Sequence, residues 1–352
     1  DLTHKPAYLG RGSMPSTRSM TRRQSRRLLT LSHDELGVIA DGLADPLQPE
    51  IAVALSSVCV GLRMPLKAML ENLHGQHERA RTLCRKLGKT CATMRDADQL
   101  HCDDDPEEIH LCIDDDDKER FTVDDLATLA MILSTSGLPQ LDTLRILDYD
   151  CCDAVFPALC DGLMHGAPVL RKLWLEHLFL GPASAKALAS ALGKSTLRRL
   201  EYLDLRGNLI GAEGMSTLAV PLRKMPALKC LGLGENNLGA EGVAALVANL
   251  GKDDFKELEI LDLHGNAFGD ERGQSANHTG WSALADAIAA RRSECTMPHL
   301  YQLYFWDNPL PPQSAENLLA AHVKAEEPFE NNERRGISLW STKWKPLRYT
   351  PG

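Results

Sequence analysis

Residues 200–210 read LEYLDLRGNLI, and residues 228–238 repeat the pattern as LKCLGLGENNL. The spacing returns at 258–268 as LEILDLHGNAF and at 300–310 as LYQLYFWDNPL. Each copy has apolar residues at its positions 1, 4, 6 and 11 and an Asn at position 9. Self-similarity at a fixed spacing predicts a repeat architecture, in which neighbouring units stack to bury one continuous core.

Two degenerate copies precede these four and begin at Leu141 and Leu170. Successive copies start 28 to 30 residues apart, except for a last step of 42 that predicts an inserted loop near 270–280 or 291–297. The alternating leucines of each copy predict a short strand with one buried face. The Asn at position 9 is expected to satisfy the backbone of the turn that follows. These predicted structural asparagines are Asn208, Asn236, Asn266 and Asn308.

Amphipathic helices are predicted between the strands, at residues 213–222, 241–250 and 281–290. The whole pattern resembles the ribonuclease-inhibitor-like class of leucine-rich repeats over residues 138–325. That resemblance implies an α/β solenoid of about six β-α repeats with a parallel sheet on its concave face. It implies a binding scaffold and carries no chemistry of its own.

A different, helical block is predicted over residues 28–100, with helices at 34–43, 50–62 and 65–87. Pro65 fits the first turn of the third helix, and Gly88 fits its end. Residues 31–63 loosely resemble an F-box. This block and the repeats also resemble repeat-protein families of unicellular algae, through DPLQPEIAVALSSVCVGLR at 45–63, LCRKLG at 83–88 and TVDDLATL at 122–129.

Charge is unevenly distributed along the chain, whose 352 residues carry a net charge of −9. Residues 1–27 are predicted to be a basic extended arm, 101–137 an acidic loop followed by a capping helix, and 326–352 an extended C-terminal arm. Arg and Ser enrichment without acidic residues is typical of organelle-targeting segments, which favours a chloroplast or mitochondrion over the cytoplasm. The arm residues predicted to contact partners are Arg22, Arg23, Arg26, Arg27, Trp340, Trp344 and Tyr349.

Metal binding is an alternative interpretation of the acidic loop. Residues 103–117 hold nine carboxylates, but they lack the Asp spacing and the Gly of a calcium loop. His101, Cys102, His110 and Cys112 could ligate zinc, although their spacing matches no standard site. We therefore predict neither a metal nor a cofactor. The ten cysteines form no CxxC pair and are predicted to be mostly reduced core residues.

Enzyme motifs are absent from the sequence: it has no phosphate-binding Gly loop, no dinucleotide fingerprint, no GxSxG and no HExxH. We therefore expect that the protein is not an enzyme.

No apolar run approaches the roughly 20 residues that a membrane-spanning helix needs. The acidic balance disfavours nucleic-acid binding, except through the basic N-terminal arm. His264 has no nucleophile at a recognisable spacing and is predicted to be a surface residue.

The predicted binding surface consists of the residues that alternate with the buried leucines and line the concave face. Its aromatic side chains favour a protein-binding hot spot, with mutual packing or cover by the tail as the alternative. Gly232 and Gly234 are expected to leave a trough free of side chains. Three functions are consistent with this surface. The first is a scaffold subunit of a large, organellar assembly; the alternatives are an F-box-like substrate receptor of a ubiquitin ligase and a free cytosolic recognition protein. The predicted partner-binding residues are Lys172, Trp174, Tyr202, Arg206, Gly232, Gly234, His264, Tyr304 and Trp306.

Overall fold

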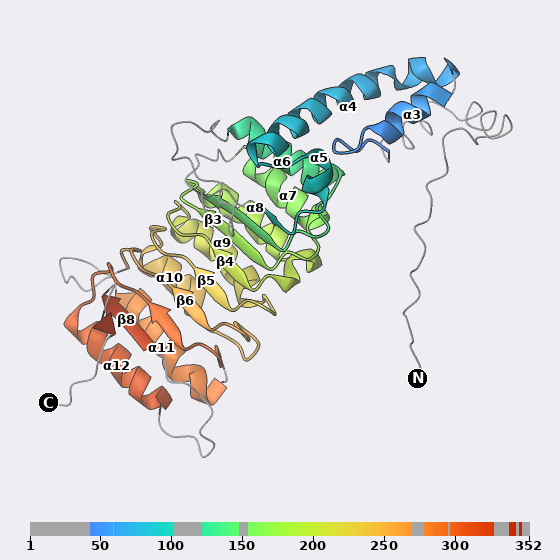
Figure 1. The fold of residues 1–352 in the computed structure, drawn as a ribbon. Coiled ribbons are helices and arrows are strands. Elements are labelled where there is room, and N and C mark those ends of the chain that lie inside the picture. Colours follow the sequence, from blue (N-terminus) through green and yellow to red (C-terminus); the bar gives the residue numbers. More distant parts are fainter. Residues whose placement is uncertain are drawn as a thin grey trace, which may run out of the picture. The chain divides into compact units, whose positions relative to one another are not determined.

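Figure 1 shows a computed structural model of the chain. It describes residues 43–58, 60–100, 122–147, 154–268, 278–294, 296–326, 338–342 and 345–346. The chain divides into two compact units, residues 1–77 and 78–352. The predicted basic arm, the predicted helix at 34–43, the candidate calcium and zinc ligands, and the first predicted insertion up to residue 277 lie outside the described residues.

The first unit contains helix α3 (Glu50–Val58) and the beginning of helix α4 (Val60–Lys86). Asp45 shapes the turn before α3, because its Oδ1 accepts the Leu47 N–H at 2.8 Å. His77 Nδ1 lies 2.7 Å from the Pro46 carbonyl oxygen and joins α4 to this turn. The prediction that the third helix starts at Pro65 is wrong, since α4 begins at Val60. A long helix can continue through a proline at the cost of one backbone hydrogen bond.

The second unit opens with the end of α4, where Gly88 confirms its predicted role. Its φ of +62° suits glycine, and its N–H donates to the Arg85 carbonyl at 3.0 Å. Helix α5 (Cys91–Arg95) and strand β1 (Gln99–Leu100) follow. Helix α6 (Val123–Thr135) begins with a capping box between Thr122 and Asp125. Lys86 Nζ donates to Asp125 Oδ2 at 2.8 Å.

The repeats form one sheet in which strand order follows sequence order (Figure 1). β1 to β8 are parallel, and β9 is antiparallel to β8. The α/β leucine-rich-repeat solenoid predicted from the sequence is confirmed. The remaining strands are β2 (Thr143–Leu147), β3 (Lys172–Glu176), β4 (Tyr202–Asp204), β5 (Cys230–Gly232), β6 (Ile260–Asp262), β7 (Gln302–Tyr304), β8 (Ser338–Thr342) and β9 (Lys345–Pro346).

A helix follows each of the strands β2 to β7 and covers the face of the sheet opposite the predicted binding surface. Leucines at equivalent positions pair across neighbouring strands, as Leu203 does with Leu173 and Leu231, and all three are fully buried. The 3-10 helix η2 (Ser195–Arg199) precedes β4. The helices are α7 (Phe156–Gly166), α8 (Pro182–Leu192), α9 (Gly211–Arg223), α10 (Gly239–Val247), α11 (His278–Glu294) and α12 (Pro312–Glu326).

The tail that the sequence presents as an extended arm contributes two strands to this sheet. Residues 338–340 pair in parallel with β7, and residues 345–346 pair with β8. The backbone of this part of the tail therefore bonds to the chain itself. Trp344 and Tyr349 lie outside the described residues, and Trp340 is placed only by its backbone, opposite Tyr304.

Candidate functional site

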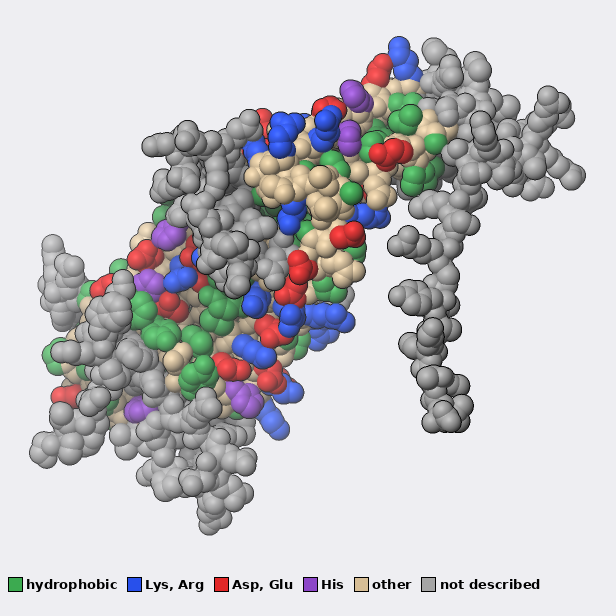
Figure 2. All heavy atoms as spheres, in the orientation of Figure 1, with side chains coloured by type: hydrophobic (Ala, Val, Ile, Leu, Met, Phe, Trp, Pro, Cys, Tyr) green, Lys and Arg blue, Asp and Glu red, His purple; other side chains and the backbone are tan. Residues whose placement is uncertain are grey.

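The candidate site lies on the open face of the sheet, where side chains alternate with the buried leucines. Its aromatic residues are all half-buried: Trp174, Tyr202, Tyr304 and Trp306. Lys172, at the start of β3, is exposed. Figure 2 shows acidic and basic side chains intermingled with hydrophobic ones over the region of β3 to β6. The face therefore combines partly exposed aromatic rings with mixed charge.

A charged cluster occupies β3, β4 and the residues just after β4. The Nε of Arg206 donates to both carboxylate oxygens of Asp204 at 2.9 Å, and its Nη2 lies 3.2 Å from Glu176 Oε2. Arg206 therefore links Glu176 at the end of β3 to Asp204 at the end of β4. Tyr202 donates its hydroxyl to Asp204 Oδ2 at 3.2 Å. Glu176 and Asp204 are both buried, so these ionic contacts lie largely out of solvent.

The buried Glu176 carboxylate is surrounded by charges of both signs. Burial raises the pKa of Glu176 and the charge of Asp204 raises it further, while the charges of Arg206, Arg145 and His177 only partly oppose them. Burial lowers the pKa of Arg206, but the charge and hydrogen bond of Asp204 together with the charge of Glu176 outweigh it, so the net shift is upward.

Aromatic rings flank this cluster on one side. The ring centroids of Trp174 and Tyr202 lie 4.6 Å apart, and the Arg145 guanidinium lies 5.6 Å from the Trp174 ring. Burial and the neighbouring Asp204 raise the pKa of Tyr202, so its hydroxyl stays protonated as a hydrogen-bond donor. The aromatic pair is thus held in place by neighbours and still retains accessible surface.

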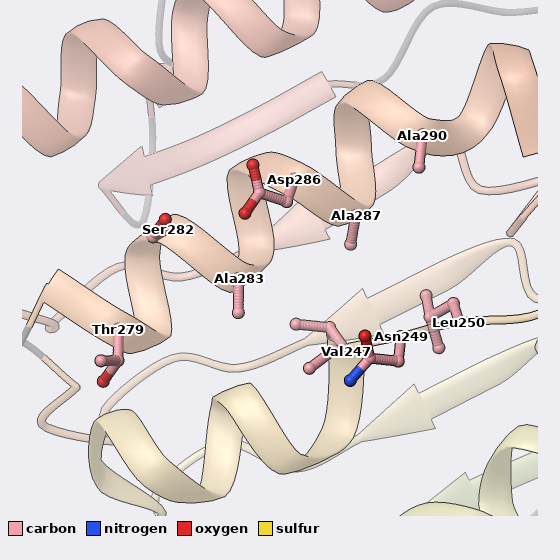
Figure 3. Close-up of a pocket in the computed structure, with 10 residues that line it drawn as sticks. Val247, Asn249, Leu250, Thr279, Ser282, Ala283, Asp286, Ala287 and Ala290 are labelled. Carbon is pink, nitrogen blue, oxygen red and sulfur yellow. The ribbon is translucent and has the colours of Figure 1, made fainter.

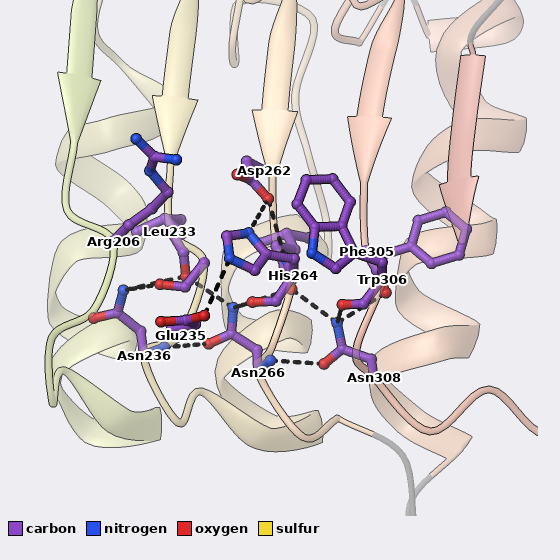
Figure 4. Close-up of polar contacts among 12 residues, drawn as sticks. Arg206, Leu233, Glu235, Asn236, Asp262, His264, Asn266, Phe305, Trp306 and Asn308 are labelled. Carbon is purple, nitrogen blue, oxygen red and sulfur yellow. Dashed lines mark hydrogen bonds and ion pairs between the residues drawn. The ribbon is translucent and has the colours of Figure 1, made fainter. Parts of the chain in front are cut away.

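A second cluster surrounds His264, just after β6 (Figure 4). Its Nδ1 lies 2.7 Å from Asp262 Oδ1, and its Nε2 lies 3.6 Å from Glu235 Oε1. The imidazole stacks on Trp306 with ring centroids 4.6 Å apart, and Tyr304 meets Trp306 edge-on at 5.2 Å. His264 is buried, so the prediction of a surface histidine is wrong.

The charge environment of His264 favours the imidazolium. Burial lowers the pKa, but the hydrogen bond and charge of Asp262 and the charge of Glu235 outweigh it, so the pKa is raised. Arg206 opposes this shift from across β5. Such an Asp–His pair could act as a base in an enzyme, yet the contacts of His264 among the described residues include no Ser, Thr or Cys nucleophile.

The two glycines of the central strand do not form an open trough, so that prediction is wrong. Both are buried. A Cβ built on Gly232 would collide with the Asp204 carboxylate, and one built on Gly234 would collide with the His264 ring. The space that the glycines leave is therefore filled by side chains from the neighbouring strands.

The predicted structural asparagines form a continuous ladder beside the site (Figure 4). Asn266 donates from Nδ2 to the Leu233 and Leu263 carbonyls at 2.8 and 3.0 Å, and its Oδ1 accepts the N–H groups of Asn236 and Leu238. The side chains of Asn208 and Asn308 make the equivalent contacts to their preceding repeats. Asn236 differs, since its Oδ1 accepts no hydrogen bond from any described residue.

The predicted partner-binding residues did not include four neighbours that organise the site, namely Arg145, Asp204, Glu235 and Asp262. The sequence contained a usable signal, because Asp-x-Arg at 204–206 and Asp-x-His at 262–264 put both members of each pair on one face of an extended segment. The lateral contacts of Arg145 and Glu235 join residues that are about one repeat apart in sequence, and no local pattern reveals them.

A groove of about 680 Å³ lies on the helical side of the sheet, between the end of α10 and α11 (Figure 3). Val247, Leu250, Ala283 and Ala287 contribute its apolar lining. Asp286 is the one ionisable residue among the described residues that line it, and Asp286 is exposed. The groove therefore lacks the paired titratable groups that acid–base chemistry requires.

Cysteines and metal ligands add no chemistry in the part of the chain that the structure describes. Cys84, Cys91, Cys160 and Cys230 form no disulfide, and burial raises the pKa of Cys230 to about 12. Across the described ranges, no three His, Cys, Asp or Glu side chains gather as metal ligands. No described helix is long and apolar enough to cross a bilayer.

Comparisons with known proteins agree with this architecture. A family model described as Leucine Rich repeat matches residues 197–219 and 224–247. The matched residues are thus leucine-rich repeats, and the repeat region of the chain is similar in sequence to a ribonuclease inhibitor. Domains of this type generally mediate protein–protein interaction. Neither the algal nor the F-box-like resemblance finds support among these matches.

Two curated relatives are similar over the repeats. The "Ribonuclease inhibitor" of Sus scrofa is 31% identical over 138 residues, which cover 38% of this chain and 29% of that protein. The "NACHT, LRR and PYD domains-containing protein 3" of Macaca mulatta is 31% identical over 144 residues, covering 41% of this chain and 13% of that protein. The chain therefore matches less than a third of either relative. A solved structure of "Leiomodin-1 Actin-Binding Site 2 (ABS2)" aligns at 14% identity with a TM-score of 0.32, covering 44% of this chain and 77% of that chain.

Proposed function

We propose that this chain is a non-catalytic scaffold that binds another protein through the open face of its sheet. The observation that carries the proposal is the pair of half-exposed aromatic clusters, Trp174 with Tyr202 and Tyr304 with Trp306. Protein-binding hot spots are enriched in Trp, Tyr and Arg that are already held in place, because little side-chain entropy is then lost on binding. Hydrogen bonds and ring contacts hold these rings before any partner arrives.

The finer proposal is that the chain is an accessory subunit of a large organellar assembly, in a chloroplast or mitochondrion. Seven basic residues and no acidic residue between Leu2 and His33 support it, since this composition is typical of organelle-targeting segments and also suits contact with acidic subunits. The predicted arm residues Arg22, Arg23, Arg26, Arg27, Trp344 and Tyr349 would add contacts beyond the sheet.

Native fractionation of an extract from the chain's own cells tests the proposal, with mass spectrometry of the proteins that co-migrate. We expect the tagged wild-type chain in a high-mass fraction and a variant with Trp174→Ala, Tyr202→Ala and Trp306→Ala near 38.7 kDa. Val220→Ala is the matched control, because Val220 is 61% exposed on α9, within the helical layer. Assembly of the triple variant at the wild-type level would refute binding through this face.

A further inference from the structure

Four side chains gather at the β2 to β4 end of the open face. Arg145 lies opposite Trp174 in the register of β2 and β3, and the Arg145 guanidinium lies 5.6 Å from the Trp174 ring. Lys172 lies opposite Tyr202 in the register of β3 and β4. The rings of Trp174 and Tyr202 are in contact, with centroids 4.6 Å apart. These four residues, here called the basic corner, therefore place two cations beside two half-buried aromatic rings.

Lys172 is exposed and forms no ion pair with any described residue. Asp142, which precedes one register partner of Lys172, is paired with Arg171. Glu201, which precedes the other register partner, is paired with Lys229. The fold does not require a charge at the position of Lys172, since the equivalent residues of the other repeats are uncharged: Thr143, Tyr202, Cys230, Ile260 and Gln302.

The basic corner keeps one positive charge after the buried carboxylates nearby are matched. Arg206 bonds to both Asp204 and Glu176. Arg145 and His177 also act on Glu176 as positive groups. The two guanidinium groups thus balance the two buried carboxylates, and the lysine of the basic corner remains unmatched among the described residues. An exposed cation beside aromatic rings is complementary to a carboxylate beside an apolar side chain.

We propose that the basic corner binds a segment of another protein in which an Asp or Glu lies within a few residues of an aromatic or aliphatic residue. The carboxylate pairs with Lys172, and the apolar side chain covers the rings of Trp174 and Tyr202. A single unmatched cation suits a carboxylate better than the successive phosphates of a nucleic acid, and the net charge of −9 opposes binding of such a polyanion. This inference rests on the proposed function, because it names the chemistry of the partner and the end of the face that the partner contacts.

The test selects peptides with the full chain as bait, from a random dodecapeptide library displayed on phage. We expect the enriched sequences to place Asp or Glu within about four residues of an aromatic or aliphatic residue. The affinity of a synthetic enriched peptide is then measured by fluorescence anisotropy against the wild type and against variants whose folding is checked by circular dichroism.

Two substitutions of Lys172 test the role of its charge. Lys172→Gln removes the cation but keeps a long polar side chain, and it should weaken binding by about three- to fivefold. Lys172→Glu should weaken binding by at least about tenfold, and a peptide whose acidic residue is replaced by lysine should regain affinity for this variant. Added salt should weaken binding to the wild type more than binding to Lys172→Gln. Lys186→Gln is the matched control and should bind as the wild type does, because Lys186 is an exposed lysine on α8, in the helical layer.

Enriched peptides without acidic residues, or equal binding by the wild type and Lys172→Glu, would overturn the proposal. It would also be refuted if acidic peptides are selected only after the nine carboxylates at 103–117 are changed to amides, because the chain's own acidic segment would then be the occupant.

The proposed function and this inference can fail separately. Loss of binding with Trp174→Ala and Tyr202→Ala, but with neither Lys172 variant, would support the proposed function and refute this inference. Native assembly of the triple variant at the wild-type level, with peptide binding that still depends on Lys172, would refute the proposed function alone.

Discussion

The asparagine ladder allows a quantitative comparison between two side chains of the same type. Asn236 and Asn266 are both fully buried, and each donates from Nδ2 to three backbone carbonyls. They differ at Oδ1. Asn266 accepts the N–H groups of Asn236 and Leu238 at 3.0 and 3.2 Å, whereas the Oδ1 of Asn236 has no partner among the described residues.

Replacing Asn266 by Ala should therefore destabilise the protein more than replacing Asn236 by Ala. Asn266→Ala leaves two buried N–H groups without an acceptor, and each costs about 1–3 kcal/mol. Asn236→Ala loses the same kind of Nδ2 contacts but also removes a buried acceptor that was already unsatisfied. We expect a loss of about 3–5 kcal/mol for Asn266→Ala and about 1–2 kcal/mol for Asn236→Ala.

Urea unfolding followed by circular dichroism at equilibrium measures this difference. The fluorescence of Trp281, which packs against Phe268 and Phe305, serves as a second probe to check that unfolding is cooperative. Asn317→Ala is the matched control, since Asn317 is exposed on α12 and should cost less than about 0.5 kcal/mol. Equal losses for the two ladder variants, or a larger loss for Asn236→Ala, would refute the reasoning.

Three further predictions concern the two charged clusters. Gly234→Ala should displace the His264 ring and destabilise the protein by about 1–3 kcal/mol, and unchanged unfolding in urea would contradict this. Because Asp262 helps raise the pKa of His264, the stabilisation from the imidazolium is complete below pH 6.5 and is lost as the pH rises through the higher folded-state value. The free energy of unfolding of the wild type should then fall more between pH 5.5 and pH 8.5 than that of His264→Gln. The same pH dependence in both proteins would refute a contribution of the His264 imidazolium to stability. Arg206→Gln removes the guanidinium that bonds to the buried Glu176 and Asp204. It should cost about 2–4 kcal/mol at pH 7 and less at pH 4, as measured by unfolding at both pH values.

The repeat pattern predicted most of the fold, because each leucine, asparagine and glycine in it has one structural role that depends on local spacing. Leu203 and Leu231 had to face the core, and Asn266 had to close its turn, whichever residues surrounded them. β1 and β8 were not predicted, since Gln99–Leu100 and Ser338–Thr342 lack the repeat motif and gain their strand conformation by pairing with β2 and β7. Edge pairing is a tertiary effect that local periodicity does not contain.

The candidate site was only partly predictable, for a related reason. Alternation along each strand correctly placed Trp174 and Tyr202 on the open face. Alternation could not show that the His264 side chain packs over Gly234 of the preceding repeat and is buried there. That orientation depends on residues about 30 positions away in sequence. The direction of a side chain within the face is fixed by packing between repeats.

Gly232 in β5 and Gly234 just after it have a different role from the one that the sequence suggested. Asp204 lies over Gly232 and His264 lies over Gly234, so side chains from both neighbouring repeats share the space above one strand. Arg206 and His264 consequently influence each other, as the effect of Arg206 on the pKa of His264 shows. An alanine at either glycine would take up part of that shared space and separate the two clusters. The central strand therefore lets the charged cluster around Arg206 and the cluster around His264 interact across it.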